Sequence, residues 1–248
     1  MTTLPPPAPP LPWNSGTPPR LAHPRTHTHD GEPLCAYDTA MAQMDALVAR
    51  PRTADDVLLV LQHPPTLTLG RKGGREHIAA PRWQPPGQPA LDVAVHEVAR
   101  GGSVTWHAPG QLVAYPILQL NQQLGAWGNG PLGDLPAFVR LLEQCIAAAC
   151  AQFGVQTVLK PGQSGVWIDA QRKIASLGLG LRNGWTFHGL ALNVNPRLDG
   201  FAVTPCGLDG VILTSIWQVC EERGLPRPAI GEVQRALETQ LLGVLRRG

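Results

Sequence analysis

A cysteine and a lysine have side chains suited to carrying an acyl group. Cys206 lies between Pro205 and Gly207, which favour a sharp bend over a packed element. A nearby cation favours the thiolate, which is the nucleophilic form of cysteine. Lys173 is one of only three lysines in the chain. A thiol, an amine and a tight turn are the parts needed to accept an acyl group on sulfur and pass it on.

Both residues also have ordinary interpretations. Most cysteines are small buried hydrophobes, and Cys145 and Cys150 fit that description on an apolar helical face. Lys173 begins a strand-like stretch with few polar neighbours, where partial desolvation would suit it to proton transfer. It could equally be an edge-strand lysine that discourages aggregation. The residues alone leave these alternatives open.

A glycine-rich run at residues 100–107 is a second candidate site. Gly101 and Gly102 would let a ligand approach the main chain, and the Arg100 guanidinium could bind a carboxylate or phosphate. The following Pro109-Gly110 fits the centre of a type II turn. The alternative is a hairpin with satisfied polar ends, because neither a GxxxxGK[ST] loop nor a GxGxxG fingerprint is present.

Two histidines, His63 and His188, are ambiguous for a similar reason. His188 begins an apolar strand-like stretch, and His63 precedes two prolines. In such places a histidine is more often a structural hydrogen-bond partner than a catalyst.

The elements that must position these residues indicate one α+β domain with a mixed sheet. The connections are often too short for βαβ crossovers, which argues against a doubly wound fold. Apolar patterns predict strands at residues 57–61, 66–69, 93–98, 112–118, 165–168, 173–181 and 187–194, and a loop at 81–90. One helix is expected after an N-cap at Asp38 or Thr39 and should end before Pro51, and others are expected at 135–153, 215–223 and 231–246.

The N-terminus is rich in proline, and we predict a disordered tail at residues 1–30 before a catalytic domain at 31–248. His23, His27 and His29 lie in or near this tail, but a flexible arm supplies poor coordination geometry. No metal site is expected.

Composition excludes several classes of protein. The chain is 43% hydrophobic and 15% charged with a net charge of +2, which is too small for a general binder of nucleic acid or membrane surfaces. No apolar stretch is long enough for a transmembrane helix. Five cysteines without a CxxC pair favour reduced thiols and a cytoplasmic protein.

Five motifs, taken in order, resemble the lipoyl(octanoyl) transferases of lipoate biosynthesis over roughly residues 34–225. They are residues 62–71 (QHPPTLTLGR), 100–111 (RGGSVTWHAPGQ), 172–178 (RKIASLG), 187–195 (FHGLALNVN) and 204–208 (TPCGL). The resemblance implies the fold of biotin and lipoate protein ligases. It also implies that Cys206 carries the acyl thioester and that Lys173 promotes thiolate formation and shuttles protons.

The same resemblance implies three substrate-lining segments. They comprise Arg100, Gly101, Gly102, Ser103, Val104, Thr105, Trp106, His107, Ser176, Leu177, Gly178, Gly189, Leu190 and Ala191. One residue departs from the family pattern, since Ala108 stands where the family usually has glycine. Alanine is strained at positive φ, so this position is either extended or slightly strained.

The implied reaction moves an octanoyl group from octanoyl-acyl carrier protein to a lysine of lipoyl domains in 2-oxoacid dehydrogenase and glycine cleavage complexes. No cofactor is needed, and we expect a monomer. One alternative is an ATP-dependent lipoate or octanoate protein ligase, in which residues 100–102 would cradle an adenylate. Others are a non-catalytic acyl-carrier-binding module and a cysteine hydrolase, although a Cys–Lys pair without an aspartate-supported histidine fits transfer better.

Overall fold

The largest sheet places the strands of the motifs at residues 172–178 and 187–195 side by side. The computed structural model describes residues 19–25, 27–29, 31–51, 54–84, 89–119, 135–198, 201–203 and 210–245. The strands of this sheet are β1 (Arg20–Ala22), β4 (Val57–Leu61), β10 (Gln111–Ile117), β11 (Val158–Lys160), β12 (Gln163–Trp167), β13 (Arg172–Arg182), β14 (Trp185–Asn193) and β16 (Ile212–Leu213). Their order is β1-β4-β10-β14-β13-β12-β11, with β16 paired to β13. β1–β4 and β13–β16 are parallel and the other pairs antiparallel, so the sheet is mixed, as predicted.

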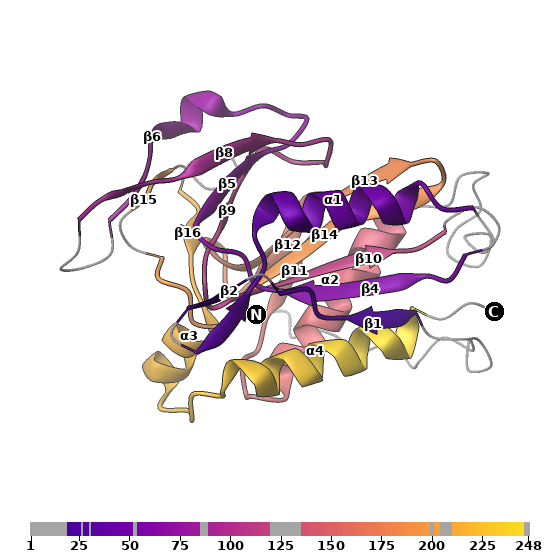
Figure 1. The fold of residues 1–248 in the computed structure, drawn as a ribbon. Coiled ribbons are helices and arrows are strands. Elements are labelled where there is room, and N and C mark those ends of the chain that lie inside the picture. The colour runs from indigo at the N-terminus through magenta and orange to yellow at the C-terminus, as the bar shows by residue number, and fades with distance from the viewer. Residues whose placement is uncertain are drawn as a thin grey trace.

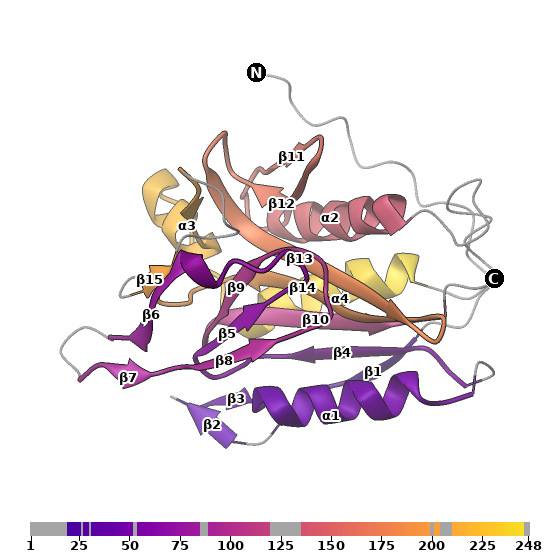
Figure 2. The same cartoon turned by 90° about the horizontal axis from the view of Figure 1, so that it is seen from above.

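Helices cover both faces of this sheet, which explains why β4 is wholly apolar. α1 (Tyr37–Val48) lies on one face, and α2 (Leu135–Ala151) and α4 (Ile230–Val244) lie on the other (Figures 1 and 2). In β4, Val57 and Leu59 pack on the α1 side, whereas Leu58 and Val60 belong to the core with α2 and α4. A strand buried on both faces reads as a continuous apolar run.

Smaller sheets flank the main one. β5 (Thr66–Leu69) lies between β8 (Ala94–Glu97) and β9 (Val104–His107), and β6 (Ile78–Trp83) lies between β7 (Leu91–Asp92) and β15 (Phe201–Val203). β2 (His27–His29) pairs with β3 (Glu32–Leu34), and a 3-10 helix, η1, covers Arg75–His77. Figure 1 shows β5, β8 and β9 at one end of the main sheet. None of the described helices is long and apolar enough to span a membrane.

The predicted α+β class is confirmed, and the helix predicted at residues 215–223 is present, with a favourable residue at each end. α3 (Ile216–Arg223) begins after Ser215, whose side chain accepts a hydrogen bond from the Gln218 amide. It ends at Gly224, which is left-handed with φ of 64°. These are the ordinary N-cap and C-cap residues of a helix. For α1 the predicted cap was wrong, because Ala36 is the N-cap and makes no side-chain cap bond.

Two other expectations differ from the structure. The prediction of disorder through residue 30 does not hold for Arg20–Ala22, because β1 pairs with the edge of β4 and Leu21 packs against the core. It does not hold for His27–His29 either, because β2 pairs with β3. Residues 1–18 of the predicted tail lie outside the described residues. The predicted loop at 81–90 overlaps the end of β6, where long-range pairing with β15 overrides a locally proline-rich sequence.

Candidate functional site

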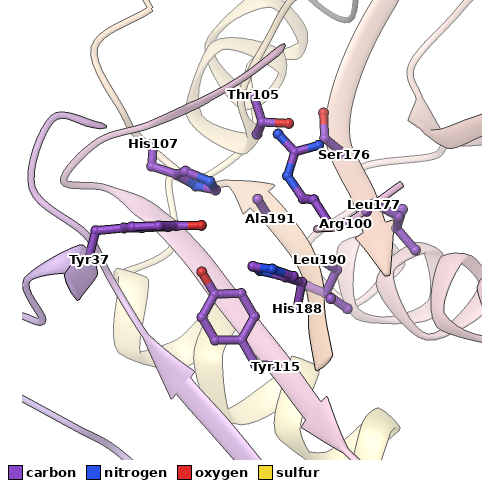
Figure 3. Close-up of a pocket in the computed structure, with 12 residues that line it drawn as sticks. Tyr37, Arg100, Thr105, His107, Tyr115, Ser176, Leu177, His188, Leu190 and Ala191 are labelled. Carbon is purple, nitrogen blue, oxygen red and sulfur yellow. The ribbon is translucent and has the colours of Figure 1, made fainter. Parts of the chain in front are cut away.

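A pocket of about 300 Å³, part of it open to solvent, lies between β9, β10, β13, β14 and the start of α1 (Figure 3). All three predicted substrate-lining segments contribute to it. Its lining comprises Tyr37, Arg100, Thr105, His107, Tyr115, Ser176, Leu177, Gly178, His188, Gly189, Leu190 and Ala191. A wider groove beside β1 and α1 includes none of the predicted residues.

Backbone forms much of one wall of this pocket. Gly178 and Gly189 are cross-strand partners in the β13–β14 pair. The side chains of Leu177 and Leu190 point away from the pocket and pack into the core on the far side of the sheet (Figure 3). A Cβ on Gly189 would lie 2.1 Å from the Ala114 carbonyl oxygen, so only glycine permits this approach of β10 to β14. The two glycines keep the wall free of side chains.

Arg100 is the positively charged residue of the pocket lining, and two neighbouring glycines leave room for its side chain. It is 5% exposed, and its guanidinium donates to the Thr68 carbonyl at 3.0 Å and the Thr68 hydroxyl at 2.7 Å. Cβ atoms built on Gly70 and Gly178 would lie 2.8 Å from Nη1 and 2.9 Å from Cδ of Arg100. The arginine is therefore held by tight packing and hydrogen bonds, with its positive charge close to the pocket.

Imidazole and phenol groups cover the opposite side of the pocket. Tyr37 stacks on His107 with ring centroids 6.1 Å apart, and Tyr115 meets His188 edge-on at 6.1 Å. Behind them, His63 Nε2 lies 2.8 Å from the Tyr115 hydroxyl. This wall is aromatic but carries several hydrogen-bonding atoms.

Burial keeps the three imidazoles neutral. It lowers the pKa of His63 to about 4 and that of His188 to about 3, with the nearby Arg100 charge adding to the effect at His188. It also holds the pKa of His107 well below the usual value, and the neighbouring His63 and Arg100 act in the same direction. Desolvation disfavours the charged form of a base. Arg100 therefore remains the charged group among these residues at neutral pH.

His188 has an unusual backbone conformation within β14. Its φ is 56°, in the left-handed region that few residues other than glycine adopt. It is 4% exposed, and its N–H lies 3.4 Å from Met44 Sδ. Such local strain is common where a side chain must face a binding site.

The turn after His107 shows how alanine is accommodated at position 108, where the family usually has glycine. The Gln111 amide donates to the Ala108 carbonyl at 3.1 Å, and Gly110 has φ of 89°. This matches the predicted type II turn with Pro109 and Gly110 at its centre. Ala108 is not among the residues with positive φ and is 1% exposed. Alanine therefore fits this position without backbone strain.

Lys173 lies outside the pocket lining, three residues before Ser176 on β13. It is 4% exposed, and its ammonium is 5.2 Å from the centre of the Trp167 ring. A Cβ on Gly165 would lie 2.2 Å from Lys173 Cε, so the lysine stem fills the space that this glycine leaves. The chain places the amine in a restricted, largely water-free environment.

Glu143 of α2 completes the surroundings of Lys173. Its carboxylate accepts a hydrogen bond from the Gly165 amide at 2.7 Å and pairs with Arg140 at 2.7 Å. Burial raises the pKa of Glu143, whereas the Gly165 bond and the charges of Arg140 and Lys173 oppose this. The acid thus fixes the strand segment against which Lys173 packs.

Not every predicted residue lies at the pocket. Gly101, Gly102, Ser103, Val104 and Trp106 are absent from its lining. Val104 and Trp106 belong to the apolar core of the small sheets, and the Ser103 hydroxyl donates to the Gly73 carbonyl at 2.8 Å. In a strand, alternate side chains face opposite sides, which separates Thr105 and His107 from these neighbours. The predicted nucleophile, Cys206, lies outside the described residues.

Comparison with known proteins places the chain in a family. Residues 36–223 match the model of the lipoyl protein ligase A/B catalytic domain. An octanoyltransferase of Geobacter metallireducens is 37% identical over 204 residues, which span 81% of this chain and 85% of that protein. One of Pseudomonas fluorescens is 41% identical over 209 residues, or 84% and 86% of the two chains.

The chain belongs to the lipoyl protein ligase A/B catalytic domain family. Its fold agrees with solved structures of ligases. Lipoate-protein ligase A bound with ATP superposes with a TM-score of 0.64 at 14% identity, covering 92% of this chain and 86% of that one. A bipartite lipoate protein ligase of Thermoplasma acidophilum gives a TM-score of 0.58 at 15% identity, covering 92% and 84%. At these identities the likeness concerns the fold alone.

Within this family fold, the pocket contains three residues absent from the sequence-based site. Tyr37 and Tyr115 have no local signal, because one begins a helix and the other lies in an apolar strand. His188 precedes a predicted segment, and its sequence position left a structural role open. Their contribution depends on strand pairing between distant parts of the chain.

The neutral imidazoles predict that acid destabilises this domain. The unfolded state binds protons near pH 6.5, whereas the folded pKa values of His63 and His188 are about 4 and 3. Stability should therefore fall as pH drops below 6.5, by up to about 1.4 kcal/mol per pH unit for each histidine. With His107 the total approaches roughly 4 kcal/mol per unit. The raised pKa of Glu143 has the opposite effect on stability, but it is one group against three histidines.

Urea unfolding followed by tryptophan fluorescence at pH 7.5, 6.5, 5.5 and 5.0 measures this effect. The unfolding midpoint should change little between the first two values and then decrease steeply. A midpoint that stays constant down to pH 5.0 would show that the imidazoles are protonated in the folded protein.

Proposed function

We propose that this chain transfers an octanoyl group from octanoyl-acyl carrier protein to a lysine of lipoyl domains, through a thioester on Cys206 with Lys173 as its proton partner. Its relatives at 37–42% identity are octanoyltransferases, and they match most of both chains. The enzyme is thus an acyltransferase of protein lipoylation. The 2-oxoacid dehydrogenase and glycine cleavage complexes contain the expected acceptor domains.

The observation that carries this proposal is the convergence of all three predicted substrate-lining segments on one pocket. Thr105 and His107, Ser176 to Gly178, and Gly189 to Ala191 all line it. β9 lies far from β13 and β14 in sequence, whereas β13 and β14 follow one another, and residues of all three strands line the same pocket (Figure 3). A concave site with a buried cation and a few polar groups is the usual form of a substrate pocket.

The cysteines support the choice of nucleophile by elimination. Of the five in the chain, Cys35, Cys145, Cys150 and Cys220 are described, and all four are buried. Burial raises the pKa of Cys145 and Cys150 to about 12, and it also raises the pKa of the other two. Such thiols are inert near neutral pH. Cys206 is the remaining cysteine, and it is the one within a family motif.

The strand after Cys206 runs beside Lys173. Leu213 pairs in register with Lys173, and the Thr214 amide donates to the Lys173 carbonyl at 3.0 Å. Because Cys206 precedes Leu213 by seven residues, this pairing anchors the end of its segment next to the lysine. The arrangement supports a Cys206–Lys173 pair.

The chemistry then proceeds in two steps. Lys173 takes the thiol proton, the Cys206 sulfur bonds to the acyl carbon, and the carrier's carbon–sulfur bond breaks as its sulfur receives that proton. A lysine amine of the lipoyl domain next bonds to the acyl carbon, and the bond to Cys206 breaks. Thioester to amide is downhill, so the reaction needs no ATP. We also propose a cytoplasmic location, which accords with four free thiols among the described cysteines.

Intact-protein mass spectrometry tests the proposal. After mixing with octanoyl-acyl carrier protein, the chain should gain the mass of one octanoyl group, and a lipoyl domain should then remove it. Both steps should proceed without ATP or magnesium. An unchanged mass under these conditions would exclude a covalent acyl-enzyme, and transfer that requires ATP and free octanoate would indicate a ligase.

A further inference from the structure

Four buried polar residues connect the pocket to the strand beside Lys173. His107 Nδ1 lies 2.7 Å from Gln111 Oε1, and Gln111 Nε2 donates to Asn193 Oδ1 at 2.9 Å. Asn193 Nδ2 donates to the Thr214 carbonyl at 3.0 Å. His107, Gln111, Asn193 and Thr214 are each at most 6% exposed. The Thr214 amide in turn bonds the Lys173 carbonyl, so one network joins pocket and lysine.

This network determines which nitrogen of His107 carries the proton. Backbone carbonyls only accept, so the Asn193 group facing Thr214 must be the NH₂, and its oxygen must face Gln111. Gln111 Nε2 also donates to the Trp106 carbonyl at 3.0 Å, which fixes that amide in the same way. The Gln111 oxygen therefore faces His107 Nδ1, and Nδ1 must donate. His107 Nε2 is left with a lone pair.

The ring of His107 lines the pocket and points toward its centre (Figure 3). In the part of the chain that the structure describes, its hydrogen bond is the one from Nδ1 to Gln111. The groups around the ring are the charged Arg100, which disfavours an imidazolium, the neutral imidazoles of His63 and His188, and the stacked Tyr37. His107 thus presents a neutral acceptor to whatever enters the pocket.

An octanoyl group has no N–H or O–H that could donate a hydrogen bond to His107 Nε2. The lysine amine that receives the octanoyl group does have N–H groups. We propose that Gln111 and Asn193 are positioning residues that hold His107 as the tautomer protonated on Nδ1, and that His107 Nε2 takes the proton of the attacking amine. This inference rests on the proposed function, because it concerns the second half of that reaction. Lys173 serves the thiol, and His107 serves the amine.

The proton balance of the step is simple. The neutral amine nitrogen bonds to the acyl carbon and passes one hydrogen to His107 Nε2, while the carbon–sulfur bond to Cys206 breaks. The departing sulfur regains one proton, and the imidazolium releases one, through water or Lys173. One proton has moved from nitrogen to sulfur, and His107 ends neutral. General bases of this kind typically contribute about 10²- to 10⁴-fold to a rate.

The tautomer can be tested without substrate. In the full chain labelled with ¹⁵N-histidine, long-range ¹H–¹⁵N correlation at pH 7 should show His107 protonated on Nδ1, with an unprotonated Nε2. In Gln111→Glu, the carboxylate keeps the bond from Nδ1 but adds a negative charge, so both nitrogens should be protonated. A wild-type His107 protonated on Nε2 would overturn the inference.

The half-reactions test the catalytic role. His107→Asn keeps an N–H for Gln111 but has no atom in place of Nε2. Transfer from the preformed acyl-enzyme to a lipoyl domain should fall about 100-fold, and acylation by octanoyl-acyl carrier protein should fall much less. Gln111→Glu should slow transfer in the same selective way. Gln218→Glu, at the exposed end of the network where Gln218 accepts from Thr214, is the matched control and should change neither step.

The outcomes separate the two proposals. Equal slowing of both half-reactions in the His107 and Gln111 variants, or no slowing of transfer, would overturn the role of His107. A wild-type chain that never gains the octanoyl mass would instead reject the proposed function and with it the assignment of the amine. The tautomer measurement would still decide the first part of the inference.

Discussion

Replacing Cys206 by alanine is expected to abolish the octanoyl adduct and to reduce transfer to lipoyl domains to the uncatalysed background. The substitution removes the sulfur on which the acyl group would be held, and no described cysteine can replace it. Cys35, Cys150 and Cys220 are 0% exposed and Cys145 is 4% exposed. The measurement is the intact mass after incubation with octanoyl-acyl carrier protein, together with octanoylation of a lipoyl domain.

A matched control separates loss of chemistry from loss of folding. Cys220→Ala removes a thiol buried in α3 and should retain the full adduct, with a modest decrease in stability from the small cavity. Both variants should give the circular dichroism spectrum of the native chain. An adduct of normal yield on Cys206→Ala would place the nucleophile elsewhere, and peptide mapping would then locate it.

Replacing Lys173 by methionine is expected to slow acylation by about 10²- to 10⁴-fold, the usual contribution of a general acid–base group. Methionine keeps the length and apolar stem of the side chain in the gap beside Gly165 but has no amine. Folding should be retained, because the methionine side chain fills the space beside Gly165 and Glu143 keeps its pairing with Arg140 and its bond from the Gly165 amide. A folded but nearly inactive variant would therefore show that Lys173 takes part in the reaction and is not needed for the stability of the fold.

Lys160 provides the matched control for this experiment. Its ammonium lies 3.6 Å from the centre of the Trp167 ring, compared with 5.2 Å for Lys173, but it lies on β11 away from the predicted motifs. Lys160→Met should acylate within about twofold of the native rate. Alkylation of Cys206 by iodoacetamide should also require a higher pH in Lys173→Met and not in Lys160→Met. Native acylation kinetics in Lys173→Met would remove the lysine from the mechanism.

The sequence predicted elements well where the signal is local. The apolar run Val57–Leu61 indicated a strand buried on both faces, and Ser215 and Gly224 indicated the two ends of α3. Such patterns act over a few residues, so they can be recognised without knowledge of the fold. The predicted disorder through residue 30 was wrong at Arg20–Ala22, because β1 has little local signal and gains its stability from pairing with β4.

The order of five short motifs was enough to indicate the family, and the roles of Cys206 and Lys173 that this resemblance implies stay predictions. The tertiary structure decided which residues of those motifs face the pocket, since alternation in β9 turns Thr105 and His107 inward and Val104 toward a separate core. Register between distant strands also brought Gln111 opposite Asn193, which lies 82 positions further along the chain. Residue types are a property of the chain, whereas such contacts depend on strand pairings that no local pattern encodes.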